Sequence, residues 1–241
     1  NVALDLALQT TYPSWGCMIH NKYEPATTVW ELWNSDNATI QMNSRNHHMF
    51  GTVSSWFYKF VAGIQPLEPG YSRIKIHPTI MNHQNLTHVQ AKVVTPHGDI
   101  RSLWKRTTST TQKNETMVVF TQNLLLPPGT STVLTVPIVS TTTPTSYSAG
   151  QSSIGKHHHQ QHMRGIRSPA PDDDADASTI ITEGEIPVWK DGHYVPGVAG
   201  VLNATKVGGR VELELSNGRF SFETTIAIMS SSPQLGSFIK Q

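Results

Sequence analysis

The sequence contains a single cysteine, Cys17, among its 241 residues. One thiol excludes a disulfide within the chain and argues against a cysteine-based zinc site. The neighbouring Trp15 and Gly16 favour a packing role for this thiol over a nucleophilic one. The sequence also lacks any run of about 18 apolar residues, so it predicts no membrane-spanning helix.

Charged residues are scarce at 15% of the sequence, and they are almost balanced, with a net charge of +1. This composition provides neither a basic stripe for a nucleic acid nor a strong acidic surface field. We therefore expect no nucleic-acid partner and no membrane partner, and we predict no cofactor and no bound metal.

The most informative stretch places one carboxylate, Glu31, between two tryptophans. It reads TTVWELW at residues 27–33, and MNSRNHHMFG follows at residues 42–51. Aromatic rings stack on the apolar faces of a pyranose, amides and imidazoles bind its hydroxyls, and a carboxylate transfers a proton. The pattern indicates a carbohydrate-active site.

The same residues also fit a helix start. Thr28 and Glu31 have the spacing of a capping box, in which both side chains bind free backbone N–H groups. Asn43 and Ser44 are good N-cap residues, which would place His47 in a first helical turn. The residues alone leave the capping and the catalytic interpretations open.

Two kinds of periodicity divide the chain. Apolar residues recur every three or four positions from His48 to Ile64, which predicts a helix that buries one face and ends near Gly63. Beyond it, alternating and β-branched runs separated by turn residues predict a β-sandwich. The predicted strands are 73–76, 88–95, 100–105, 117–121, 132–139, 211–215 and 219–222.

A segment at 140–178 differs from the rest, being rich in Ser, Thr, Pro, Gly and Gln. Its low apolar content predicts a disordered insertion in a loop of the sandwich. It carries the tract HHHQQH at 157–162. Imidazoles bind zinc, copper and nickel, but we interpret any metal binding by such a tract as adventitious.

Four N-glycosylation sequons, at Asn37, Asn85, Asn114 and Asn203, favour a secreted protein. A chain this rich in Ser and Thr also produces sequons by chance, so the localisation stays undetermined.

A sandwich with exposed aromatic residues would allow a second kind of function, a non-catalytic carbohydrate-binding module. The candidate aromatic residues are Trp104, Trp189 and Tyr194. Trp104 lies in an alternating strand and Trp189 in an apolar run, so the pattern favours core packing for both tryptophans.

The order and spacing of several blocks resemble the bacterial-type α-L-rhamnosidases of glycoside hydrolase family 78. The blocks are TTYPSWG at 10–16, ATTVWE at 26–31, MNSRNH at 42–47, GTVSSWFY at 51–58, AGI at 62–64, PGY at 69–71, TPHG at 95–98, LPPGTST at 126–132 and PVW at 187–189. The resemblance implies the C-terminal portion of an (α/α)6 six-hairpin barrel at 1–64, followed by an antiparallel β-sandwich at 65–241.

The resemblance also implies an activity, the hydrolysis of terminal α-L-rhamnose from rhamnose-containing glycosides or polysaccharides with inversion. Glu31 then corresponds to the general base, and His47 binds the sugar or orients Glu31. Trp15, Trp30 and Trp33 become candidates for the wall of the sugar pocket. A six-hairpin glycosidase that acts on another sugar stays open as an alternative.

The sequence departs from the family pattern in three ways. An inverting site needs a second carboxyl as general acid, and Asp5 and Glu24 do not lie in an acidic motif of the family's kind. Leu32 and His48 also replace residue types that are common in relatives. We therefore expect the chain to be a fragment that is inactive alone and depends on a missing N-terminal part of the same enzyme.

Overall fold

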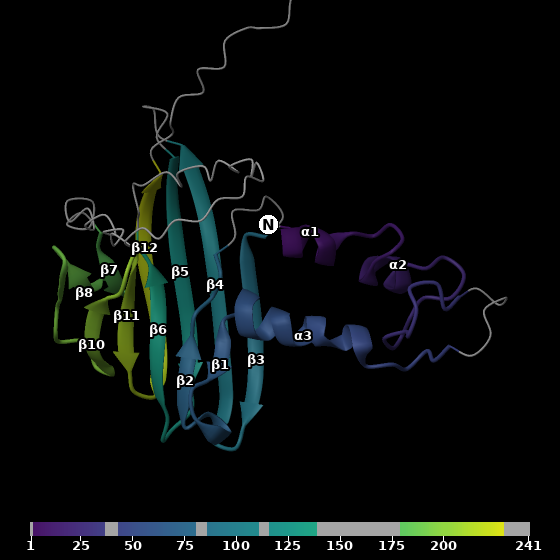
Figure 1. Ribbon diagram of the computed structural model, residues 1–241. Coiled ribbons are helices and arrows are strands. Elements are labelled where there is room, and N and C mark those ends of the chain that lie inside the picture. The colour runs from purple at the N-terminus through teal and green to yellow at the C-terminus, as the bar shows by residue number, and fades with distance from the viewer. Residues whose placement is uncertain (1, 37–42, 81–85, 111–115, 139–178, 229–241) are drawn as a thin grey trace, which may run out of the picture.

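The computed structural model describes residues 2–36, 43–80, 86–110, 116–138 and 179–228. A helical part comes first, with α1 (Val2–Leu8), α2 (Trp15–Ile19) and a continuous segment of η1 (Met49–Gly51), α3 (Thr52–Trp56) and the π-helix η2 (Phe57–Val61). These helices project to one side of the strands (Figure 1). Within the described ranges, every helix is too short or too polar to cross a membrane.

The strands form two sheets. The five-stranded sheet has the order β1 (Ile64–Pro66), β2 (Arg73–Ile76), β6 (Ser131–Pro137), β11 (Arg210–Leu215) and β10 (Val201–Lys206), with the short helix η3 (Pro69–Tyr71) between β1 and β2. The seven-stranded sheet has the order β3 (His88–Thr95), β4 (Gly98–Thr110), β5 (Thr116–Leu126), β12 (Gly218–Ile228), β7 (Ile181–Glu183), β8 (Ile186–Lys190) and β9 (His193–Tyr194). Only the β2–β6 pair is parallel among the described strand pairs.

One hydrophobic core joins the two sheets. Residues alternate along each strand, so β4 turns Ile100 and Trp104 inward and leaves Arg101 exposed. Trp104 and Phe120 come from the seven-stranded sheet, and Leu134 and Leu213 from the five-stranded sheet; all four are almost fully buried in the same cluster. Burial of apolar surface between the sheets is therefore the main stabilising term for the β part.

The coarse prediction of a helical part followed by mostly β structure is confirmed. The predicted helix forms over Met49–Val61, but it does not bury an apolar face within the described chain. Met49, Phe57 and Phe60 are exposed, and only Val61 at the C-terminal end is buried. The apolar face is thus present but largely uncovered in the described chain: Phe50 packs on Trp33 at one end, whereas Phe57 and Phe60 stay exposed, which agrees with the expectation of a fragment.

The core-packing interpretation of the tryptophans is confirmed, because Trp104 and Trp189 are buried in the shared core. Tyr194 is half-buried and donates its hydroxyl proton to Val201 O at 2.9 Å. These three residues therefore do not form an exposed platform on which a sugar could stack.

Several predicted features lie outside the described residues, namely the insertion at 140–178 with its His tract and the sequons at Asn37, Asn85 and Asn114. Asn203 is described, and it lies exposed on β10 next to a β-bulge.

The helical part joins the β part at a tightly packed junction. Trp104 Nε1 donates a hydrogen bond of 2.8 Å to Val61 O at the end of η2, and Thr79 N donates one of 2.8 Å to Phe60 O. Gly63 follows with φ of +80°, and a Cβ atom there would lie 2.2 Å from Pro78 N. Only glycine fits this turn between the helix and β1.

The Trp104 hydrogen bond can be tested against a natural control. Trp189 is buried in the same core, but its Nε1 has no hydrogen-bond partner among the described residues. We predict that Trp104→Phe lowers the free energy of unfolding by about 1–3 kcal/mol more than Trp189→Phe, because only the first leaves a buried carbonyl unpaired. Urea denaturation of both variants measures the difference, and equal losses would contradict the prediction.

His77, just after β2, anchors the same junction. Its N–H donates to Gly63 O at 2.8 Å, and its ring bonds Thr135 Oγ1 at 3.0 Å and the guanidinium of Arg210. Partial burial, followed by the nearby charges of Arg210 and Lys75, lowers the pKa of His77 from its usual value near 6.5. The neutral ring is therefore the form that fits the folded state.

This shift predicts a pH dependence of stability. The unfolded chain takes up a proton at His77 at a higher pH than the folded chain, so the free energy of unfolding falls as pH drops below about 6.5 and levels off below the folded-state pKa. His77→Gln should remove this part of the slope, whereas His193→Gln, at an exposed histidine, should retain it. Urea titrations between pH 5 and 8 measure both, and an unchanged slope in His77→Gln would contradict the assignment.

Candidate active site

Two loop segments, one around Glu31 and one around Ser44, bring the predicted catalytic residues together. Glu31 N donates to Ser44 O at 2.8 Å, and Ser44 N donates to Glu31 Oε2 at 2.6 Å. His47 N donates to Val29 O at 2.7 Å. Since no helix begins at Thr28, the capping-box interpretation is wrong: pairing with the segment around Ser44 replaces the helix.

The Glu31 carboxylate is half-buried and held by one of its two oxygens. The backbone N–H of Ser44 fixes Oε2 through a short, charge-assisted bond. Among the described residues, Oε1 of Glu31 makes no hydrogen bond. One oxygen is thus oriented by the protein and the other can accept a proton.

His47 has a defined tautomer when neutral. Its Nδ1 accepts the Met49 N–H at 3.2 Å, so the ring proton lies on Nε2. The ring is half-buried, and Nε2 is therefore a hydrogen-bond donor two residues along the pairing from Glu31.

Three aromatic residues, Trp15, Trp33 and Phe50, pack against one another next to the Glu31 loop. The rings of Trp33 and Phe50 stack at 4.0 Å between centroids, and Trp15 meets Trp33 edge-on at 5.3 Å. Trp15 Nε1 also donates to Phe50 O at 3.0 Å, which ties α2 to the start of the long helical segment. Trp30 is separate, 2% exposed and lying beneath the Arg45 guanidinium.

The local sequence explains how Trp15 is placed. Ser14 caps α2 by accepting the Cys17 N–H at 2.9 Å. Gly16 lies so close to the preceding loop that a Cβ atom would be 2.4 Å from Gln9 O. The TTYPSWG block therefore serves packing at a point where a larger residue does not fit.

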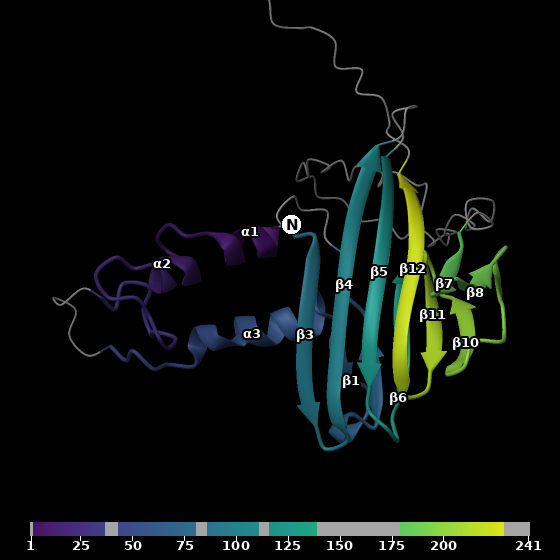
Figure 2. The same cartoon turned by 180° about the vertical axis from the view of Figure 1, so that it is seen from behind.

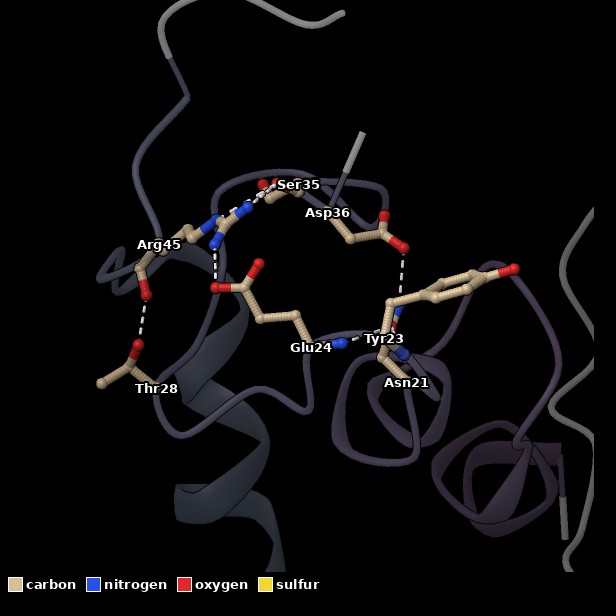
Figure 3. Close-up of polar contacts among 7 residues, drawn as sticks. All are labelled: Asn21, Tyr23, Glu24, Thr28, Ser35, Asp36 and Arg45. Atoms are coloured by element: carbon tan, nitrogen blue, oxygen red, sulfur yellow. Dashed lines mark hydrogen bonds and ion pairs between the residues drawn. The ribbon is translucent and has the colours of Figure 1, made fainter. Parts of the chain in front are cut away.

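Arg45 connects the loop segments that carry Glu24, Thr28 and Ser35, as Figure 3 shows. Its side chain forms an ion pair with Glu24 and donates to Ser35 O from Nε at 3.2 Å and from Nη2 at 3.0 Å. Its carbonyl accepts the Thr28 hydroxyl proton. Arg45 thus holds the loops that flank the Glu31 segment in one arrangement.

Sequence reasoning missed Arg45, Glu24 and Phe50 as parts of the site. Arg45 lies inside the MNSRNH block, which was the only signal that could have found it. Its partner Glu24 is 21 residues away, and a loop-to-loop ion pair leaves no periodic pattern. A neighbouring contact of the same kind joins Asn21 Nδ2 to Asp36 Oδ2 at 2.6 Å.

Metal ligation is not indicated in the part of the chain that the structure describes, since no group of three or more His, Cys, Asp or Glu side chains is positioned to hold an ion there. Of the nearby carboxylates, Glu24 is bonded to Arg45 and Asp36 to Asn21. Glu31 differs from both, because its Oε2 accepts a backbone N–H and its Oε1 makes no hydrogen bond among the described residues.

Comparisons with known proteins identify first the class of enzyme scaffold to which the chain is similar and then its family. Residues 1–61 match a six-hairpin glycosidase domain described as that of bacterial α-L-rhamnosidases, which defines a glycosidase scaffold. Residues 63–148 match the C-terminal domain of the same enzymes. The chain belongs to the bacterial α-L-rhamnosidase family.

Individual α-L-rhamnosidases are similar to this chain in sequence or in fold. An α-L-rhamnosidase of Formosa agariphila is 35% identical over 137 residues, covering 55% of this chain and 13% of the relative. The solved α-L-rhamnosidase of Dictyoglumus thermophilum has a TM-score of 0.59 at 22% identity, over 92% of this chain and 18% of that one. The Streptomyces avermitilis α-L-rhamnosidase complexed with L-rhamnose has a TM-score of 0.51 at 23% identity, over 91% and 15%. The chain thus spans less than one fifth of each of these relatives.

The role of Arg45 can be measured without an activity assay. We predict that Arg45→Lys speeds amide hydrogen exchange at Glu31 and His47 by about fivefold, because lysine cannot make the two bonds to Ser35 O. The effect is modest because the side chain is partly exposed. Arg73→Lys on β2 is the matched control and should leave both amides unchanged; equal exchange in the two variants would contradict the role.

Proposed function

We propose that this chain is part of an α-L-rhamnosidase that removes terminal α-L-rhamnose from glycosides or polysaccharides with inversion, and that Glu31 is the general base. Family membership supports the substrate class, and one relative was solved in complex with L-rhamnose. The observation that carries the proposal is the Glu31 carboxylate, with Oε2 fixed by Ser44 N–H and Oε1 unbonded among the described residues.

In the proposed reaction, Glu31 Oε1 takes a proton from a water molecule while the water oxygen attacks the anomeric carbon of the sugar. The bond between that carbon and the leaving oxygen breaks on the opposite face of the ring. A second carboxyl gives its proton to the leaving oxygen, so charge and protons balance. Ser44 N–H keeps the base oriented during the transfer, which lowers the cost of positioning the water.

The general acid is the missing partner of Glu31 in this proposal. The two carboxyls of an inverting site lie about 6.5–9.5 Å apart. Glu24 forms an ion pair with Arg45, and Asp36 accepts a hydrogen bond from Asn21, so neither carboxyl fits the role of general acid. We assign the acid to a part of the enzyme outside this chain.

The exposed helix faces support the same arrangement. Phe57, Phe60 and Met49 project from the long helical segment, and Leu6 and Leu8 are exposed on α1. A monomeric protein rarely leaves such surface in contact with water. We propose that further helical hairpins cover it, so that residues 1–64 complete an (α/α)6 barrel and residues 65–241 form the β-sandwich beside it.

For substrate binding, we assign His47 Nε2–H to a sugar hydroxyl and Trp33 and Trp15 to the pocket wall. All three side chains are half-buried, Trp33 lies two residues after Glu31, and Trp15 packs edge-on against Trp33. Trp30, beneath Arg45, supports the wall from inside. A six-hairpin glycosidase acting on another sugar is the alternative, and no contact among the described residues favours it.

The base assignment has a kinetic test in the full-length enzyme. We predict that Glu31→Gln lowers kcat for an aryl α-L-rhamnoside by about 10²–10⁴, with a small change in KM, because the amide keeps the bond from Ser44 but cannot accept a proton. Glu214→Gln, at an exposed carboxylate on β11, is the matched control and should be normal.

Near-normal turnover by Glu31→Gln would contradict the assignment. The 241-residue chain alone should show no turnover, because it lacks the general acid, and turnover by this chain would contradict the placement of the acid elsewhere.

A further inference from the structure

The outer face of the seven-stranded sheet, opposite the core, carries a hollow of about 420 Å³. Figure 2 looks onto this face, where β3, β4, β5 and β12 run side by side. The hollow lies in the β part, whereas Glu31 lies in the loops of the helical part, and neither Glu31 nor His47 lines it. It is therefore a separate feature from the proposed rhamnose site.

Strand register arranges the outward side chains in two adjacent rows across β3, β4, β5 and β12. The first row is Lys92, Arg101, Leu125 and Arg219, and the second is Gln90, Leu103, Asn123 and Ser221. Neighbouring strands lie about 4.8 Å apart, so each row spans about three strand spacings. That length matches two or three sugar units better than a single small ion.

The charges of the first row are only partly compensated. Asp99 pairs with Lys92 at 2.9 Å and with Arg101 at 3.1 Å, and these hydrogen bonds lower the pKa of Asp99. Arg219 forms no ion pair among the described residues. Glu183, at the edge of the hollow, is engaged by the backbone, since its Oε1 accepts the Ser221 N–H at 3.2 Å.

The second row provides neutral hydrogen-bonding groups. Gln90 and Asn123 are both exposed on the sheet, and their side-chain amides make no hydrogen bonds within the described residues. Asparagine is disfavoured inside strands, so local structure does not explain Asn123 in the middle of β5. Leu103 and Leu125 form an apolar floor beside these amides.

This combination selects a class of ligand. Among the described residues that line the hollow, Phe220 is the one aromatic residue, and it is buried in the core, so it offers a neutral sugar no exposed stacking platform. A guanidinium binds a carboxylate or a sulfate through two parallel N–H groups, and amides and a hydroxyl bind sugar hydroxyls. We propose that the hollow binds an anionic saccharide segment, with Arg219 on the acidic group and Asn123 on the adjoining hydroxyls.

Calorimetric titration of the 241-residue chain tests this site without any catalytic turnover. The probes are tetragalacturonate, its uncharged methyl ester, a sulfated carrageenan tetrasaccharide and inorganic sulfate. At low salt we expect one acidic oligosaccharide to bind at least about tenfold more tightly than the methyl ester. The tighter of the two identifies carboxylate or sulfate as the recognised group.

Variants locate the binding. Arg219→Gln should weaken binding of the acidic oligosaccharide by about tenfold, and Asn123→Ala by about fivefold. Arg73→Gln, the same charge loss at an exposed site on the five-stranded sheet, is the matched control and should bind normally. Thermal midpoints check that each variant is folded. We expect them to be close to that of the unmodified chain, because the substituted positions are exposed.

Three outcomes with the oligosaccharides would overturn the proposal, and a fourth with inorganic sulfate would do so as well. They are equal binding of the acidic oligosaccharide and the methyl ester, unchanged binding in Arg219→Gln, and no binding of either oligosaccharide. Inorganic sulfate binding as tightly as the oligosaccharides would show an adventitious ion only and would also overturn it. Because no result depends on Glu31, failure here is distinct from failure of the rhamnosidase proposal.

Discussion

The helical part takes its position from one buried hydrogen bond, the bond from Trp104 Nε1 to Val61 O. The last carbonyls of a helix have no partner within the helix, and a buried carbonyl without a partner is costly. Here the sheet supplies the donor from the middle of β4, in the centre of the core. Gly63 then turns the chain directly into β1, so the helix direction is set by the β part.

Contacts continue from this junction to the candidate base. The long helical segment runs back from Val61 to Phe50, whose ring stacks on Trp33 and whose carbonyl receives the Trp15 indole N–H. Trp33 lies two residues after Glu31, so packing against the helix start constrains the loop that carries the carboxylate. Packing contacts thus run without a break from the junction at Val61 to the loop that carries Glu31.

Much of this fold could be predicted from alternation alone. Strands β2 and β3 have the predicted bounds, because inward and outward residues alternate there without interruption. Strand β4 extends beyond its prediction to Thr110, where the residues are polar and only pairing with β5 maintains the strand. Strands β8 and β10 were missed because Pro187 and Asn203 are unfavourable in strands, and tertiary pairing overrides that preference.

The site was predictable to a smaller extent, for a related reason. Motifs singled out Glu31 and His47 as candidates, but the capping rule gave the wrong local structure, because Glu31 Oε2 accepts a hydrogen bond from Ser44 N at a separation of 13 residues. Long-range loop contacts such as Glu24 with Arg45 have no period in the sequence. The helix face at Phe60 illustrates the opposite case, in which the pattern correctly marked an apolar surface that nothing in the described chain covers.

Two exposed surfaces of this chain differ in chemistry, and the difference bears on what each contacts. The helix face around Phe57 and Phe60 is apolar, so its burial is favourable by about 25 cal/mol per Å² and depends little on salt. The outer sheet face around Arg219 and Asn123 has charge and side-chain amides that make no hydrogen bond among the described residues, and its charged interactions weaken as ions screen them. One partner surface does not suit both faces, since an apolar partner packed on the sheet face would leave the buried Arg219 guanidinium without hydrogen bonds. Protein helices suit the first surface, and a hydrated anionic ligand suits the second.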